Sequence, residues 1–190
     1  MYEMRPATTN DWQPVSTMIS LRELWLCERG LRSHGEGNAI RGLIGQNDET
    51  TKVMVLVEDD QILGCTVLIS KPPLTGWTEA ERAEPSLIMA MTHTHPAPAY
   101  RGDRLGWLMT LWVLDYAARL EDEVRWVRCT VADKRLMCHL RDNHGWQYVR
   151  SAHDPQRGIV HLLQHRSQAK PGLSALVASP ESDHCATART

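Results

Sequence analysis

The most constraining feature of this sequence is a strand, a glycine-containing loop and a long helix that follow one another in the middle of the chain. Residues 87–94 have the composition of a buried strand, and residues 105–120 have the apolar spacing of a helix. The loop between them ends in Tyr-Arg-Gly-Asp-Arg-Leu-Gly at residues 100–106. The first turn of a helix has unpaired N–H groups and a partial positive charge, and glycine lets the backbone approach a phosphate closely. Because Arg101 and Arg104 add formal charge there, the loop predicts a pyrophosphate site.

The elements around this unit predict a mixed α/β sheet within one domain. Strands are expected at residues 3–8, 53–58, 62–69, 87–94, 124–131, 146–151 and 159–164, and helices at residues 11–30, 38–46, 105–120 and 134–143. The turn Asp59-Asp60 predicts an antiparallel hairpin, and residues 71–85 are expected to be a polar loop. A length of 190 residues suits one domain, which we expect over residues 1–167. Residues 168–190 lack periodicity, so we expect a disordered tail there.

The overall composition excludes several classes of protein. A net charge of −2 gives no general attraction to nucleic acid or to an anionic membrane. No stretch approaches the roughly 18 apolar residues of a membrane span, and the N-terminus lacks the apolar core of a signal peptide. The five cysteines show no CxxC spacing, so we expect reduced thiols in a cytoplasmic protein. His93 and His95 alternate as metal ligands can, but without a third ligand nearby no metal is expected.

The glycine-containing loop resembles the coenzyme motif of the GNAT (Gcn5-related N-acetyltransferase) superfamily. That motif has the pattern Arg/Gln-x-x-Gly-x-Gly/Ala at the start of the family's third helix. Arg101 and Gly106 match its first and last positions, and Gly102 occupies a variable position. Arg104 stands where the family has its middle glycine. A dinucleotide-binding Rossmann motif is excluded because its third glycine and its first-strand position are missing.

A second segment resembles the other family signature, in which a strand and a helix precede the dipeptide Gly-Phe. Here the strand 124–131 and the helix 134–143 precede Gly145-Trp146, with tryptophan in place of phenylalanine. The order of the elements matches the family over about residues 3–165. The resemblance therefore rests on two signatures in the same register rather than on the loop alone.

Membership of this family would imply both a fold and an activity. The fold would be a mixed, mostly antiparallel sheet of about seven strands, with the coenzyme site at its central strand-loop-helix unit. The activity would be direct transfer of an acetyl group from acetyl-CoA to a primary amine of a small molecule or peptide. The alternative is a non-catalytic module that binds acyl-CoA. Family members often pair as homodimers, so a dimer is also expected.

The resemblance also implies which residues bind the coenzyme. In the family, the strand before the loop splays away from its neighbour, and its backbone pairs with the amides of the pantetheine arm. The family's coenzyme-contacting asparagine and its tyrosine fall on Lys134 and Arg141, counted from Gly145. The expected coenzyme-binding residues are Thr92, His93, Thr94, Arg101, Gly102, Asp103, Arg104, Leu105, Gly106, Lys134 and Arg141.

Two residues are candidates for a catalytic role. His93 could act as the base that deprotonates the amine, because an imidazole titrates near neutral pH; the alternative is that it only packs. Arg141 could stabilise the leaving thiolate, although a guanidinium is no proton donor at neutral pH. Glu79 and Glu81 are further candidates for the base, with simple solvation as the alternative.

Two tryptophans are candidates for the wall of the acceptor pocket. Trp25 lies on the first predicted helix, and Trp77 lies on the loop before the central strand. Each could instead belong to the core, since buried tryptophan is common where its N–H finds a partner. The sequence carries no signature that identifies the acceptor amine.

Overall fold

The computed structural model describes residues 1–179 apart from residues 32–34, 47, 72–74, 101–103 and 121–122. The strands are β1 (Tyr2–Pro6), β2 (Thr51–Glu58), β3 (Gln61–Ile69), β4 (Ser86–Thr94), β5 (Trp126–Val131), β6 (Gln147–Asp154), β7 (Gly158–Arg166) and β8 (Val177–Ala178). The helices are α1 (Trp12–Cys27), α2 (Glu36–Leu43), α3 (Glu79–Ala83), α4 (Leu105–Arg119) and α5 (Lys134–His144), with short 3-10 turns at Thr9–Asp11, Pro98–Tyr100 and Leu173–Ala175.

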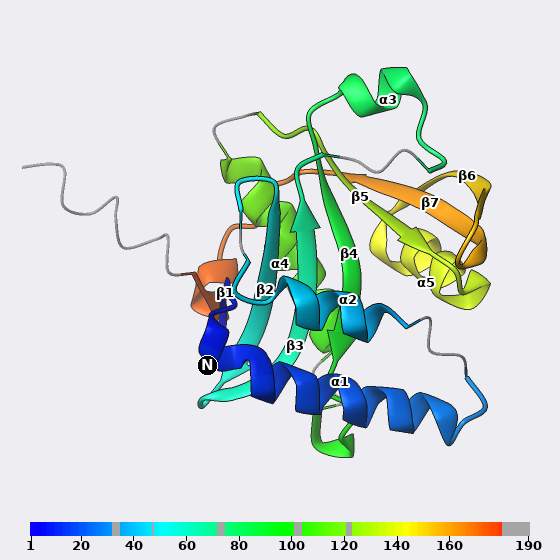
Figure 1. The fold of residues 1–190 in the computed structure, drawn as a ribbon. Helices are drawn as coiled ribbons and strands as arrows, with labels where there is room; N and C mark the ends of the chain where they lie inside the picture. Colours follow the sequence, from blue (N-terminus) through cyan, green and yellow to red (C-terminus); the bar gives the residue numbers. More distant parts are fainter. Residues whose placement is uncertain (32–34, 47, 72–74, 101–103, 121–122, 180–190) are drawn as a thin grey trace, which may run out of the picture.

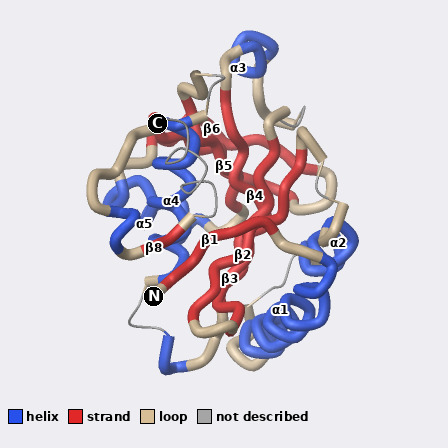
Figure 2. Tube along the Cα trace, turned by 90° about the vertical axis from the view of Figure 1, so that its left-hand side faces the viewer, coloured by secondary structure: helices blue, strands red, loops and turns tan. Residues whose placement is uncertain are grey.

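The described strands form one eight-stranded sheet in the order β6-β7-β5-β4-β3-β2-β1-β8. Helices α1 and α2 cover one face of the sheet, and α4 and α5 cover the other (Figures 1 and 2). The pairings are antiparallel except for β4 with β5 and β1 with β8. The predicted mixed, mostly antiparallel α/β fold is therefore confirmed.

The predicted hairpin is the pair β2 and β3, which turns at Asp59 and Asp60. Both residues have positive φ angles, 47° and 64°. Two positive φ angles are the mark of the type I′ turn, whose twist matches that of the flanking strands. Aspartate tolerates this region better than most residues do, so the dipeptide suits the turn.

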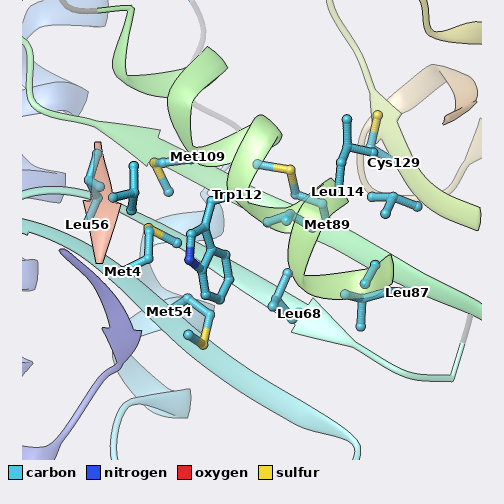
Figure 3. Close-up of a cluster of buried hydrophobic side chains, with 14 of the residues drawn as sticks. Met4, Met54, Leu56, Leu68, Leu87, Met89, Met109, Trp112, Leu114 and Cys129 are labelled. Atoms are coloured by element: carbon cyan, nitrogen blue, oxygen red, sulfur yellow. The ribbon is translucent and has the colours of Figure 1, made fainter. Parts of the chain in front are cut away.

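Two apolar layers hold the helices to the sheet, and the alternation of side chains along β2 contributes to both. Val53 and Val55 face α1 and α2, whereas Met54 and Leu56 face α4. Because the chain has no phenylalanine, methionines fill much of the α4 side. Figure 3 shows Trp112 of α4 close to Met54 and Met4. Thioethers adapt to irregular gaps and make favourable contacts with aromatic rings.

The C-terminal segment corrects the predicted domain boundary. Residues 168–179 are packed against the domain, since Leu173 and Val177 are buried and the Lys170 N–H donates to Asp115 at 2.6 Å. Strand β8 also adds to the edge of the sheet, in parallel with β1. The disordered tail expected from residue 168 is therefore wrong for this segment, and β8 raises the strand number from the expected seven to eight. The last part of the predicted tail, residues 180–190, lies outside the described residues.

The loop expected before the central strand contains a short helix, α3, and is tied to the sheet by a buried arginine. Thr78 caps α3 by accepting from the Glu81 N–H at 3.2 Å. Arg128 of β5 is fully buried, and its guanidinium donates to Glu84 at 2.7 Å and to the backbone oxygen of Glu81. These bonds fix the loop above the start of β4. Within the described residues, no helix is both long enough and apolar enough to span a membrane.

Replacing Arg128 with alanine should destabilise the domain, because it removes a buried cation and leaves its partners without a donor. The Glu84 carboxylate is 41% exposed and can be solvated, so the loss comes mainly from the space left by Arg128 and from the backbone oxygen of Glu81. We expect the free energy of unfolding to fall by about 2–3 kcal/mol in urea titrations. The control is Arg125→Ala just before the same strand, at an exposed position where the cost should stay within about 0.5 kcal/mol. Equal losses in the two variants would contradict this account of the loop.

Candidate active site

The candidate site is the opening left where β4 and β5 part. The two strands pair in parallel only over Ser86–Ile88 and Trp126–Arg128, and they then diverge (Figure 1). A cavity of about 1060 Å³ lies there, lined by residues of α1, α2, β4, α4, β5, α5 and the β6–β7 turn. This volume is at the upper end for a ligand pocket, so the cavity has room for a large ligand.

The backbone of β4 is distorted just beyond the point where the strands part. Met91 has a φ of +49°, and the register with β3 shifts beside it. The Thr66 hydroxyl lies under this bulge, 3.0 Å from the carbonyl oxygen of Ala90 and 2.9 Å from the Thr92 hydroxyl. Met91 and Thr92 both line the cavity. Strained bulges that re-aim the backbone are frequent next to active sites.

The predicted residues of β4 divide between the two faces of the strand. Thr92 and Thr94 line the cavity, whereas His93 does not. The His95 N–H donates to Leu63 of β3 at 2.7 Å, so strand alternation turns the N–H and carbonyl of Thr94 toward the opposite edge. Among the described strands, none pairs with that edge here, because β5 has already diverged. Backbone groups are thus exposed where the amides of an extended ligand could pair with them.

The predicted phosphate loop is described from Arg104 onward, and Arg101, Gly102 and Asp103 lie outside the described residues. Arg104, Leu105 and Gly106 all line the cavity, and α4 begins at Leu105. A Cβ atom built on Gly106 would meet only the Thr94 methyl group, at 3.9 Å. The site therefore has space for alanine at this position, as in the Gly/Ala alternative of the motif.

Arg104 precedes α4 in the left-handed conformation, with φ 50° and ψ 43°. This explains why a glycine is favoured at the equivalent place in the motif, since only glycine adopts that conformation without strain. An arginine there costs roughly 1–2 kcal/mol but brings a guanidinium to the start of the helix. The departure from the motif therefore preserves the backbone shape and adds a charge.

Comparisons with known proteins give a result for structure but none for sequence. No family model matches the chain, and no curated protein sequence matches it. Solved structures do match it, among them one from Desulfovibrio desulfuricans assigned to the GNAT family of acetyltransferases, with a TM-score of 0.62. It is 13% identical, and the match covers 88% of this chain and 100% of the other.

Two further structures carry more specific descriptions. One is the ribosomal-protein-S18-alanine N-acetyltransferase from Escherichia coli, 11% identical with a TM-score of 0.59, covering 90% of this chain and 98% of the other. The other is a spermidine N-acetyltransferase chimera derived in part from Vibrio cholerae, 13% identical with a TM-score of 0.60, covering 87% and 95%. This chain has the GNAT fold. Identities this low show the fold alone.

Within the GNAT fold, helix α5 presents a different set of residues from the one predicted. Lys134 and Arg141 are exposed and are not among the residues that line the cavity. Arg141 instead pairs with its neighbour Asp142 at 2.7 Å. The residues of α5 that line the cavity are Leu136, His139, Leu140, Asn143 and His144. One residue corresponds to about 100° around a helix, so the residues counted back from Gly145 lie on faces of α5 that do not line the cavity.

The cavity-facing side of α5 carries two imidazoles in contact, His139 and His144, which the sequence analysis did not predict as site residues. The Nε2 atoms of His139 and His144 lie 3.0 Å apart, and Asn143 Nδ2 lies 3.1 Å from His139 Nδ1. The His144 ring stacks on Trp107 of α4, with centroids 4.0 Å apart. Burial, with the nearby His139 and Arg104, lowers the pKa of His144. The helical spacing of His139, Asn143 and His144 was the sequence signal that could have predicted a polar cluster on this face of α5.

The opposite end of the cavity is built by α1, α2 and the β6–β7 turn. Arg22 and Trp25 of α1 line it together with Glu36 of α2 and Arg157 of the turn. The Glu36 carboxylate and the Arg157 guanidinium are 3.2 Å apart, which joins α2 to the turn. Trp25 is thus in the place expected for an acceptor wall, whereas Trp77 is not.

Trp77 is a core residue rather than part of the site. It is 4% exposed, packs with Val160 and Leu162, and has the Arg128 guanidinium 4.8 Å from its ring centroid. Glu79 and Glu81 belong to the neighbouring helix α3 and do not line the cavity. Hydrogen bonds from Arg150 lower the pKa of Glu81 to about 2, so it is a poor base at neutral pH. Trp77 and these glutamates are therefore structural.

His93 lies on the α1 and α2 side of β4, next to the acceptor end. Its Nε2 is buried and has no hydrogen-bond partner among the described residues. Burial lowers the pKa of His93, against the opposing effects of Glu36 and Glu23. The imidazole is therefore neutral at pH 7 and able to accept a proton. A buried polar atom without a partner is unusual enough to need a reason.

The remaining sulfur and metal candidates give no site in the described part of the chain. Burial raises the pKa of Cys129, which lines the cavity, to about 12, so it is a thiol rather than a thiolate nucleophile. No group of three His, Cys, Asp or Glu among the described residues is placed to hold a metal ion.

Substitutions of Gly106 should separate the effect of charge from the effect of bulk at the start of α4. We expect Gly106→Glu to weaken the binding of acetyl-CoA about tenfold or more, because it places a carboxylate where an anion should bind. Gly106→Ala should change the affinity by less than about threefold, because its Cβ meets only an ordinary contact. Isothermal titration calorimetry measures both. An unchanged affinity in Gly106→Glu would mean that the phosphates bind elsewhere.

Proposed function

We propose that the protein is an N-acetyltransferase that moves an acetyl group from acetyl-CoA directly to a primary amine of a small molecule or peptide. The observation that carries this proposal is the continuity of the cavity. One cavity reaches from Arg104 and Gly106 at the start of α4, past the parting strands, to Glu36 and Arg157 on the other face. A thioester held at the first end would meet an amine that enters from the second.

In this proposal the start of α4 holds the pyrophosphate of the coenzyme. The first-turn N–H groups and the Arg104 guanidinium supply the positive field, and Arg101, Gly102 and Asp103 complete the loop. The pantetheine arm then runs along the unpaired edge of β4, where Thr92 and Thr94 line the cavity. Its amides would bond to strand backbone, as a further strand does.

In this proposal, the acetyl transfer takes place at the point where β4 and β5 part. The amine nitrogen forms a bond to the thioester carbonyl carbon, the C–S bond breaks, and the thiolate takes a proton from water. Backbone N–H groups at the Met91–Thr92 bulge are the donors that we assign to the developing oxyanion. His93, neutral and next to the acceptor end but not among the residues that line the cavity, is the base that we assign to the amine proton, which would reach it through a water molecule.

A second candidate function is a non-catalytic module that binds acyl-CoA. It is favoured by Lys134 and Arg141, which replace the family's asparagine and tyrosine and face away from the cavity. The homodimer implied by the resemblance and the cytoplasmic location stay predictions.

The two candidates separate in one assay. We expect the protein to release CoA from acetyl-CoA in the presence of a panel of primary amines, measured by thiol titration. At a coenzyme concentration 100 times the Kd, bound acetyl-CoA should also stabilise the fold by about 2.7 kcal/mol. Stabilisation without thiol release on any amine would favour the module, and the absence of both would remove the basis for either function.

The pH profile of His93→Ala tests the proposed base. Because burial lowers its pKa, the acidic limb of kcat/KM should fall below the ordinary histidine value of about 6.5. His93→Ala should lower kcat about 100-fold and remove that limb. The control is His153→Ala on the β6–β7 hairpin, which does not line the cavity and should leave the profile unchanged. A retained acidic limb in His93→Ala would make His93 a packing residue.

A further inference from the structure

The acceptor end of the cavity has a charge pattern that selects among amines. Among the described residues, the charged side chains that line the cavity from α1, α2 and the β6–β7 turn are Arg22, Glu36 and Arg157; Arg104 and Asp133 line it from the starts of α4 and α5. These three elements therefore bring two guanidiniums and one carboxylate to the lining, and the Asp154 carboxylate lies 3.5 Å from Arg157 outside the lining. A simple aliphatic amine is mostly an ammonium ion at neutral pH, and guanidiniums repel it, so an anionic group elsewhere on the acceptor would be needed to attract the acceptor to them.

Arg157 is held in place by its own turn. The Asp154 carboxylate accepts from the backbone N–H groups of Gln156 and Arg157 at 2.9 Å, and it lies 3.5 Å from the Arg157 guanidinium. On its other side the guanidinium meets Glu36 at 3.2 Å. A guanidinium has five N–H donors in a fixed fork, so these two contacts leave donors for a ligand. The Arg157 side chain is 27% exposed, which makes it both partly desolvated and reachable.

Trp25 is already flanked by cations. The guanidinium carbons of Arg22 and Arg29 lie 4.5 Å and 4.1 Å from the centroid of its ring. An aromatic ring that already attracts two guanidiniums is a poor platform for a third cation, such as a polyamine. The same arrangement sets Arg22 against the rigid ring, at the wall of the cavity. A polycationic acceptor is therefore disfavoured here, and an acceptor with an anionic group is favoured.

We propose that the acceptor is a small amine that also carries a carboxylate, in the manner of a free amino acid. Its carboxylate pairs with the guanidiniums of Arg157 and Arg22, since planar forks match carboxylate geometry. Its amine then lies on the β4 side, toward the thioester. Glu36 orients Arg157 and offsets part of its charge. This inference rests on the proposed acetyl transfer and names the class of acceptor for that same site.

The discriminating pair of substrates is an amino acid and its amide, for example phenylalanine and phenylalaninamide. The amine of the amide is the less basic of the two, so it has the larger neutral fraction at pH 7. If the protein does not recognise the carboxylate, the amide should therefore be acetylated faster than the amino acid. We expect the opposite, with kcat/KM for the amino acid about tenfold or more above that for its amide, and with spermidine the poorest acceptor.

The variants locate this preference. Arg157→Gln should lower kcat/KM for the amino acid about tenfold or more and leave that for the amide within about twofold. Arg157→Lys keeps the charge without the fork and should lie between the two. Arg29→Gln is the matched control, since Arg29 also flanks Trp25 but does not line the cavity, and it should keep the preference. Thermal melts check that each variant is folded.

Equilibrium binding keeps the inference testable apart from turnover. With CoA bound, titration of the protein with phenylalanine should give heat that phenylalaninamide does not, and Arg157→Gln should abolish it. Turnover of amines without preference for the carboxylate, or with a preference for spermidine, would overturn this inference and leave the proposed function standing. A protein that neither binds acetyl-CoA nor releases thiol would instead overturn the proposed function. No heat from phenylalanine in the CoA-loaded protein would overturn the inference by itself.

Discussion

The separation of β4 from β5 is the constraint on which the rest of the structure depends. Two neighbouring strands of one sheet pair over three residues each and then part inside the molecule. Backbone N–H and carbonyl groups in an interior need partners, so a sheet does not open in this way without support on every side. Thr66 supports the bulge in β4, Arg128 fixes the loop above the paired segment, and α4 and α5 close one side of the opening. The cavity is the space that these supports keep open.

Much of the fold was predictable because its signals are local. The strand, loop and helix around Gly106 are each marked by composition and spacing, and Asp59-Asp60 marks its hairpin by turn chemistry alone. The C-terminal segment was missed because its order comes from two buried side chains, Leu173 and Val177, and from Asp115 far back in the chain. A segment without periodicity gives no local sign that such tertiary contacts exist.

The candidate site was predictable only where a residue's role follows from the backbone beside it. Thr92, Thr94, Arg104 and Gly106, which were predicted to bind the coenzyme, line the cavity because strand alternation and a helix start determine where they lie. Lys134 and Arg141, which were predicted to bind the coenzyme, are exposed and do not line the cavity, because each residue counted along a helix changes the face by about 100°. The acceptor end was out of reach for another reason. Glu36 and Arg157 are 121 residues apart in the chain, and neither segment has a sequence pattern that predicts their contact.

The left-handed Arg104 has a consequence for how such proteins are recognised. A phosphate-binding loop requires a particular backbone conformation. A sequence motif detects that conformation only indirectly, through the glycine that adopts it most easily. When an arginine adopts the same φ and ψ angles, the backbone conformation is kept although the glycine of the motif is absent. A strict search for the glycine at this position would therefore miss a loop whose backbone at Arg104 keeps the left-handed conformation.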